Sequence, residues 1–150
     1  MRSDDARRYA RLLSYARIAL GVTAFVAPRL PSVPWVGDAE ARRPSLQLFA
    51  RSLGARDVAL GVGPVLALRH GAPARGWVEA GGLADAGDLV GSLVAWRTLP
   101  RCTRLVMVGV ITASMVASRV LATALEPAPA SEPPDEATSP PPGGGRTGGR

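Results

Sequence analysis

Four long apolar runs, separated by short polar or proline-containing segments, fill most of the first 125 residues of this chain. Each run has about the 20 residues that a helix needs to cross a hydrocarbon core of ~30 Å. Because short connections make neighbouring helices antiparallel, the pattern predicts an all-α fold, a four-transmembrane-helix antiparallel bundle. The expected helices span residues 9–27, 46–68, 76–96 and 105–125.

Proline and glycine mark the ends of these runs. Pro28 and Pro31 close the first run, because proline cannot continue a helix interior. Residues 28–45 are therefore expected to be a connecting loop that holds a short interfacial turn at most. Residues 69–73 are expected to be a tight turn.

Residues 126–150 form a low-complexity tail of Pro, Gly, Ser and acidic residues. Such a composition cannot bury enough apolar surface to offset the entropy lost on ordering the chain. We therefore expect a disordered C-terminal tail after a single membrane domain, residues 1–125.

Charged residues lie near the middle of the first three runs, where an isolated span does not tolerate them. Arg17 lies in the first, Arg56 and Asp57 in the second, and Asp85 and Asp88 in the third. Each Arg or Asp at a helix centre costs about +2.5 to +3.5 kcal/mol on insertion scales. Only the fourth run is apolar enough to insert unaided, so the first three must pair their charges with one another.

In an antiparallel bundle the middles of the helices meet, and the five charges can form one buried layer. We define the Arg/Asp layer as Arg17, Arg56, Asp57, Asp85 and Asp88, and take it as the candidate functional site. Paired charges are what membrane interiors permit. The preferred pairing joins Arg17 to Asp85 or Asp88 and Arg56 to the other, while Asp57 completes the network or stays protonated.

The alternative is a soluble four-helix bundle with these charges on its surface, which requires a polar stripe along each helix. The third run has such a face, made of Gly81, Asp85, Asp88 and Ser92. The fourth run has no polar stripe wide enough, which favours the membrane interpretation.

Small residues and tryptophans in the third and fourth runs also favour lipid. Small residues four positions apart permit close helix approach in a membrane. The pairs are Gly87 with Gly91 and Ser114 with Ser118. Trp77 and Trp96 would lie roughly 28 Å apart on one helix, the spacing of two interfacial aromatic belts, unless both are ordinary packing residues.

Composition excludes several kinds of function. The chain has 18 basic residues, all Arg, and a net charge of +6, but no basic stripe with adjacent aromatic residues, so nucleic-acid binding is not expected. Cys102 and His70 are the only residues of their types, which excludes an internal disulfide and Cys/His metal sites. No nucleophilic triad or phosphate loop is present, so we expect no enzyme, cofactor or metal.

Several short motifs resemble a family of small, uncharacterised four-helix integral membrane proteins of actinobacteria, which carry domain-of-unknown-function labels. The motifs are Arg17-x3-Gly21, Trp35-x-Gly37, the Gly-Ala-Arg-Asp core within residues 53–61, and Ala84-Asp85-x2-Asp88. The resemblance covers roughly residues 9–122. It implies the four-helix fold and the membrane location, and it implies no activity.

The sequence thus predicts a multi-pass protein of the plasma membrane with a structural or accessory role and a buried ion-pair layer. The alternative is a small, oligomeric transporter or proton- or ion-handling protein that uses the mid-membrane carboxylates. The expected partners are the lipid bilayer and further copies of the chain. Arginines are divided evenly between the two sets of loops; we expect both termini in the cytoplasm because the first helix usually dominates orientation.

Overall fold

The computed structural model describes residues 3–99 and 101–125, and every regular element in that part of the chain is an α-helix. The helices are α1 (Ser3–Val26), α2 (Arg29–Val36), α3 (Asp38–Ala41), α4 (Pro44–Arg69), α5 (Arg75–Val94) and α6 (Arg101–Ala124). The predicted all-α class is confirmed. The predicted tail, residues 126–150, lies outside the described residues.

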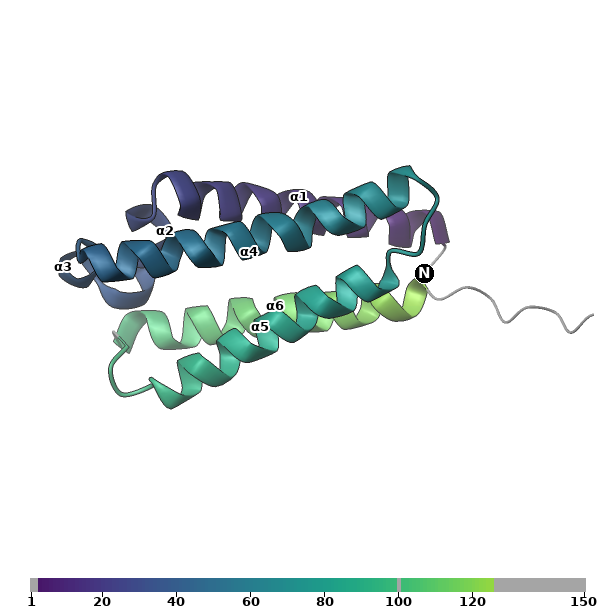
Figure 1. Ribbon diagram of the computed structural model, residues 1–150. Coiled ribbons are helices and arrows are strands. Elements are labelled where there is room, and N and C mark those ends of the chain that lie inside the picture. The colour runs from purple at the N-terminus through teal and green to yellow at the C-terminus, as the bar shows by residue number, and fades with distance from the viewer. Residues whose placement is uncertain (1–2, 100, 126–150) are drawn as a thin grey trace, which may run out of the picture.

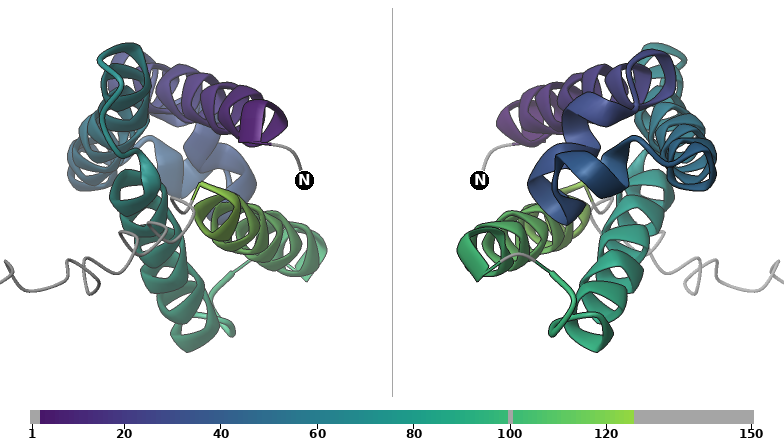
Figure 2. Two further views of the ribbon diagram at one scale, coloured as in Figure 1. Left: turned by 90° about the vertical axis from the view of Figure 1, so that its right-hand side faces the viewer. Right: turned by 90° about the vertical axis from the view of Figure 1, so that its left-hand side faces the viewer.

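The four long helices are arranged as two antiparallel pairs (Figure 1). Helix α1 packs along α4, and α5 packs along α6, so that the pairs form two layers. Both end-on views show the same division, with the short helices α2 and α3 at one end of the molecule (Figure 2). Packing within each pair is much more extensive than packing between the pairs.

Glycines bring the backbones of α1 and α4 into direct contact. A Cβ atom added to Gly21 would lie 2.6 Å from the carbonyl oxygen of Gly54, and one added to Gly54 would lie 2.5 Å from that of Gly21. Further along α4, Gly61 faces Ser14 and Ile18 of α1 in the same way. Only a residue without a side chain fits these positions, so the glycines set the distance between the two helices.

We expected Gly87 and Gly91 of α5 and Ser114 and Ser118 of α6 to allow close helix packing. In the structure the close contact between α5 and α6 is made by Gly82 and Ser118. Gly82 of α5 lies against Ser118 of α6, whose Cβ would be 3.0 Å from a Cβ at Gly82. Ser118 is therefore a close-packing residue, as its small size predicts. The prediction for Gly87 and Gly91 is wrong within the chain, because an added Cβ at either position meets nothing within 4 Å.

The segment expected to be a loop, residues 28–45, contains the two short helices α2 and α3. Pro31 does not prevent α2 from forming because it lies in the first turn, where backbone N–H groups have no partner inside the helix. The Ser32 hydroxyl adds a hydrogen bond to the carbonyl of Pro28 at 2.6 Å. The chain bends by 93° between α1 and α2.

Asp38, the first residue of α3, forms a small cluster of ion pairs at this end of the molecule. Asp38 accepts hydrogen bonds from Arg29 and from Arg42, each at 2.9 Å. These two hydrogen bonds, first that of Arg29 and then that of Arg42, hold the pKa of Asp38 below its usual value. The cluster therefore stays charged at neutral pH.

The other helix ends are shifted by a few residues from their predicted positions. Helix α1 begins at Ser3 instead of residue 9, and Asp4 and Asp5 in its first turn suit the positive end of the helix dipole. Helix α5 ends at Val94, so Trp96 lies in the turn beyond it, 5.6 Å below the guanidinium of Arg104.

Small residues fill most of the buried apolar positions, and many large apolar side chains are exposed. Among the described residues, the buried apolar positions are mostly alanines, and Val78, Leu121 and Ala122 form a small buried cluster against which Leu13 and Leu125 pack. Leucine, valine and phenylalanine side chains are exposed along all four long helices, for example Leu20, Phe49, Leu83, Val94 and Leu105.

Within residues 3–99 and 101–125, one helix is long and apolar enough to cross a membrane by length and composition alone. It is residues 104–124 of α6, in agreement with the expectation that only the fourth run inserts unaided. Helices α1 and α2 pass the same test together, as a bent pair. The charges inside α4 and α5 explain why these two helices do not pass it.

Candidate functional site

Helix α5 turns its polar face toward the other helices and its apolar face outward. Asp85 is 8% exposed and Ser92 6%, and Gly81 on the same face is buried. On the opposite face Leu83 is 74% exposed and Val94 85%. The soluble alternative places this polar stripe on the surface; in the structure Gly81, Asp85 and Ser92 are buried and Asp88 is partly exposed.

Arg17 connects α1 to both α4 and α5. Its Nη2 donates to Asp85 Oδ2 at 2.6 Å, and its Nη1 donates to Asp57 Oδ1 at 3.2 Å. The Arg17 side chain is 10% exposed, and its guanidinium lies against Gly81, where no side chain intervenes. A Cβ added to Gly81 would lie 3.6 Å from this guanidinium, in ordinary van der Waals contact.

Arg56 makes the second connection, from α4 to α5. Its two terminal nitrogens donate to the two carboxylate oxygens of Asp88 at 3.1 and 2.8 Å, a bidentate geometry. Nη2 also donates to Asp57 Oδ1 at 3.3 Å. Since the packing between the two helix pairs is sparse, the ion pairs of Arg17 with Asp85 and of Arg56 with Asp88 are specific contacts that help to hold the pairs in register.

Ser114 joins α6 to the same network. Its hydroxyl donates to Asp85 Oδ2 at 2.6 Å, so that one carboxylate oxygen receives hydrogen bonds from both Arg17 and Ser114. All four long helices therefore contribute to a single polar cluster around the Arg/Asp layer.

Removing this hydroxyl tests whether α6 is held through Asp85. Ser114→Ala is expected to lower the free energy of unfolding by about 1.5–3 kcal/mol, the usual contribution of a hydrogen bond to a charged group. The exposed Thr112 of the same helix is the matched control, and Thr112→Ala should change stability by no more than about 0.5 kcal/mol. Thermal unfolding of the purified protein in detergent measures both; equal effects would contradict the assignment.

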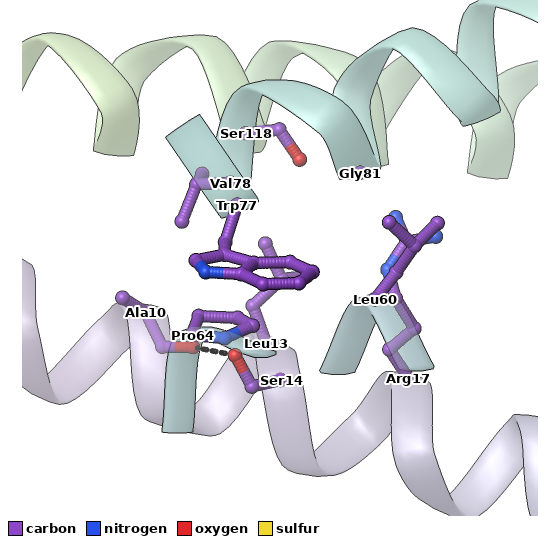
Figure 3. Close-up of a pocket in the computed structure, with 10 residues that line it drawn as sticks. All are labelled: Ala10, Leu13, Ser14, Arg17, Leu60, Pro64, Trp77, Val78, Gly81 and Ser118. Carbon is purple, nitrogen blue, oxygen red and sulfur yellow. Dashed lines mark hydrogen bonds between the residues drawn. The ribbon is translucent and has the colours of Figure 1, made fainter. Parts of the chain in front are cut away.

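A small cavity lies beside Arg17 between the two helix pairs (Figure 3). The indole of Trp77 lies over Pro64 of α4 and directly against Gly63, with Leu13 and Ser14 of α1 below it. The volume of the cavity is about 10 Å³, close to the minimum that holds one water molecule. Direct contacts, with little enclosed space, therefore satisfy the charges.

Three carboxylates lie in the site, but arginine and serine donors already occupy them. Among the described residues, no group of three or more His, Cys, Asp or Glu side chains is placed to hold a metal ion. Arginine guanidinium groups cannot lose a proton at physiological pH, so only the carboxylates of the layer can take up or release one. The arrangement suits charge pairing better than metal coordination.

The structure brings all five predicted residues of the Arg/Asp layer together. The preferred pairs are present as Arg17–Asp85 and Arg56–Asp88, and Asp57 bridges the two arginines. Sequence reasoning missed the role of Ser114 as a donor to Asp85. The only available signal was its position near the middle of the fourth run, at the depth of the charges.

Comparison of the chain with protein-family models, curated proteins and solved structures finds no significant match. In the described residues, the fold and the site define an all-helical protein with a partly buried ion-pair network between helices and one helix long and apolar enough to span a membrane.

Proposed function

We propose that this chain is a multi-pass integral membrane protein of the plasma membrane, in which the Arg/Asp layer holds two helical hairpins together. The role is structural or accessory. The proposal includes four spans, formed by α1, α4, α5 and α6, with both termini in the cytoplasm. The bilayer is the partner of the outer surface.

The observation that carries the proposal is the orientation of α5, whose polar face contacts the other helices while its apolar face is exposed. Charged Asp85 points toward other helices while Leu83, Val90 and Val94 point outward. In water this orientation leaves apolar surface exposed and adds the cost of burying ions. In a bilayer it satisfies both groups, because lipid covers the apolar face and the charges find partners inside.

The contacts of the Arg/Asp layer favour a structural role over transport of a solute. Arg17 and Arg56 each span two helices, and the distances of 2.6–3.3 Å leave no gap between donors and acceptors. The adjacent cavity of about 10 Å³ is too small for a solute larger than water. The charges therefore act as connectors that fix helix register.

Membership of the actinobacterial family of small membrane proteins is part of the same proposal. It is supported by the Gly-Ala-Arg-Asp core, residues 54–57, in which three of the four residues make specific contacts in the structure. Gly54 permits the contact with α1, and Arg56 and Asp57 enter the ion-pair network.

Carbonate washing of membranes tests the proposal. The full chain, expressed in a bacterial host, is expected to stay in the membrane pellet at alkaline pH and to enter solution only with detergent. Carbonate strips proteins that are held to the membrane by charge alone, so electrostatic binding of this basic chain does not mimic integration. Release of the chain into the carbonate supernatant would contradict the membrane proposal as a whole.

A further inference from the structure

An open apolar groove lies on the exposed side of the contact between α1 and α4. Its volume is about 340 Å³, within the usual range of small-molecule binding sites. Apolar side chains of these two helices line it: Val22, Phe25, Val26, Ala55 and Val58. In the bilayer placement of the proposed function, on which this inference rests, the groove faces lipid.

The groove borders the glycine contact between the two helices. Val58 Cγ2 would lie 3.0 Å from a Cβ added to Gly21, and the backbone nitrogen of Phe25 would lie 2.9 Å from one added to Gly54. The lining residues therefore flank the point where the two backbones touch. This close contact fixes the spacing between the two walls of the groove.

Arg51 lies on the same face of α4 as the groove, one turn before Ala55 and two turns before Val58. It is partly exposed, and within the described part of the chain it makes no hydrogen bond or ion pair. Because Cα–Cβ bonds in a helix tilt toward its start, the side chain of Arg51 leads from the groove toward the end of the molecule that holds α2 and α3 (Figure 1).

The depth of Arg51 suits a contact with lipid headgroups. Helix α4 has 26 residues and is about 39 Å long, against about 30 Å for the hydrocarbon core. Arg51 follows Pro44, the first residue of α4, by about 10.5 Å, which is roughly 6 Å inside the edge of the core when the helix is centred. An arginine at this depth extends its guanidinium to the headgroup region while its methylene groups stay in apolar surroundings.

Positive charge exceeds negative charge at this end of the molecule. Residues 28–51 contain four arginines and two acidic residues. Both acidic residues are already paired, Asp38 with Arg29 and Arg42, and Glu40 with Arg43. Arg51 therefore has no free acidic partner in this segment, and the excess of positive charge favours an anionic ligand.

We propose that the groove and Arg51 form a binding site for one anionic phospholipid. The phosphate accepts hydrogen bonds from the guanidinium of Arg51, which matches phosphate in a bidentate geometry. One acyl chain runs from there toward the membrane centre, along the groove past Ala55 and Val58. A zwitterionic headgroup is disfavoured because it brings its own cation to a region that already has excess positive charge.

Native mass spectrometry of the full chain in a non-ionic detergent tests the site by titration with phosphatidylglycerol or with phosphatidylcholine of the same acyl chains. The wild type is expected to bind the first phosphatidylglycerol about ten-fold more tightly, the effect of one hydrogen bond to a charged group. Arg51→Gln is expected to lose this preference. Arg119→Gln removes an exposed arginine of α6 that lies outside the groove; it is the matched control and should keep the preference.

The acyl-chain part of the site has its own variant, which also serves if Arg51→Gln fails to fold. Ala55→Phe fills the groove from an exposed position and leaves Arg51 in place, so it is expected to weaken phosphatidylglycerol binding while the fold is kept. Glycerol phosphate, a headgroup without acyl chains, is expected not to displace the bound lipid.

Four results would overturn the proposal. They are equal affinity of the wild type for the two lipids, a preference that persists in Arg51→Gln or is lost equally in Arg119→Gln, unchanged binding in Ala55→Phe, and displacement of the lipid by glycerol phosphate.

The two proposals fail in different experiments. A chain released by carbonate is not a membrane protein, and the groove then does not face lipid. A chain that resists carbonate but binds both lipids alike remains a membrane protein without this lipid site.

Discussion

Replacing Arg17 with leucine is expected to lower the free energy of unfolding by about 3–5 kcal/mol, the range observed when one partner of a buried ion pair is removed. The variant leaves Asp85 with Ser114 as its remaining donor and removes one of the two hydrogen bonds to Asp57. The contact between the helix pairs is weakened at the same time. Thermal unfolding of the detergent-purified chain measures the loss, together with the yield of monodisperse protein.

The double variant Arg17→Leu/Asp85→Leu separates the lost charge pair from a general packing defect. Replacing both partners of a buried ion pair with apolar residues is often neutral, so the double variant is expected to recover most of the stability that Arg17→Leu loses. Additive losses from the two substitutions would show that the residues are not coupled and would contradict the assigned pair.

Gly54→Ala is expected to lower the free energy of unfolding by about 1–3 kcal/mol, the range for overpacking a tightly packed contact. The added Cβ would lie 2.5 Å from the carbonyl oxygen of Gly21 and 2.9 Å from the backbone nitrogen of Phe25. Both are backbone atoms, so relief requires α1 to move away from α4. The same thermal unfolding assay measures the change.

Gly87→Ala is the matched control, because Gly87 is also a glycine inside a long helix but has open space around it. Alanine is the better helix former by about 1 kcal/mol, so this variant is expected to be as stable as the wild type or slightly more stable. If Gly87→Ala is destabilised as much as Gly54→Ala, the loss does not arise from the contact between α1 and α4.

Charge position made the Arg/Asp layer predictable from the sequence. Arg17, Arg56 and the three aspartates lie at similar depths in runs of similar length, and antiparallel helices bring equal depths together. Each needs an opposite charge in an apolar setting, which leaves few possible pairings.

Features that depend on rotation about the helix axis were not predictable in the same way. The α1–α4 contact uses Gly21 and Gly54, but the sequence contains 17 glycines and spacing alone pointed to Gly87 and Gly91. Which small residues meet depends on how each helix is rotated about its own axis. The charged pairs set that rotation only once the helices have packed together, so it cannot be read from the spacing of residues in the sequence. Helix α2 was missed because its prolines indicated a loop.

The most direct test of the central claim, four membrane spans, is the side of the membrane on which the connections lie. Single cysteines are introduced by Ala39→Cys, Ala72→Cys and Thr98→Cys in a Cys102→Ser background, all at exposed positions. A membrane-impermeant maleimide is added to intact cells and then to disrupted cells. With four spans and cytoplasmic termini, the cysteines at positions 39 and 98 react in intact cells, and the one at position 72 reacts only after disruption. If α6 is the only span, positions 39, 72 and 98 lie on one side and react alike, which would contradict the account.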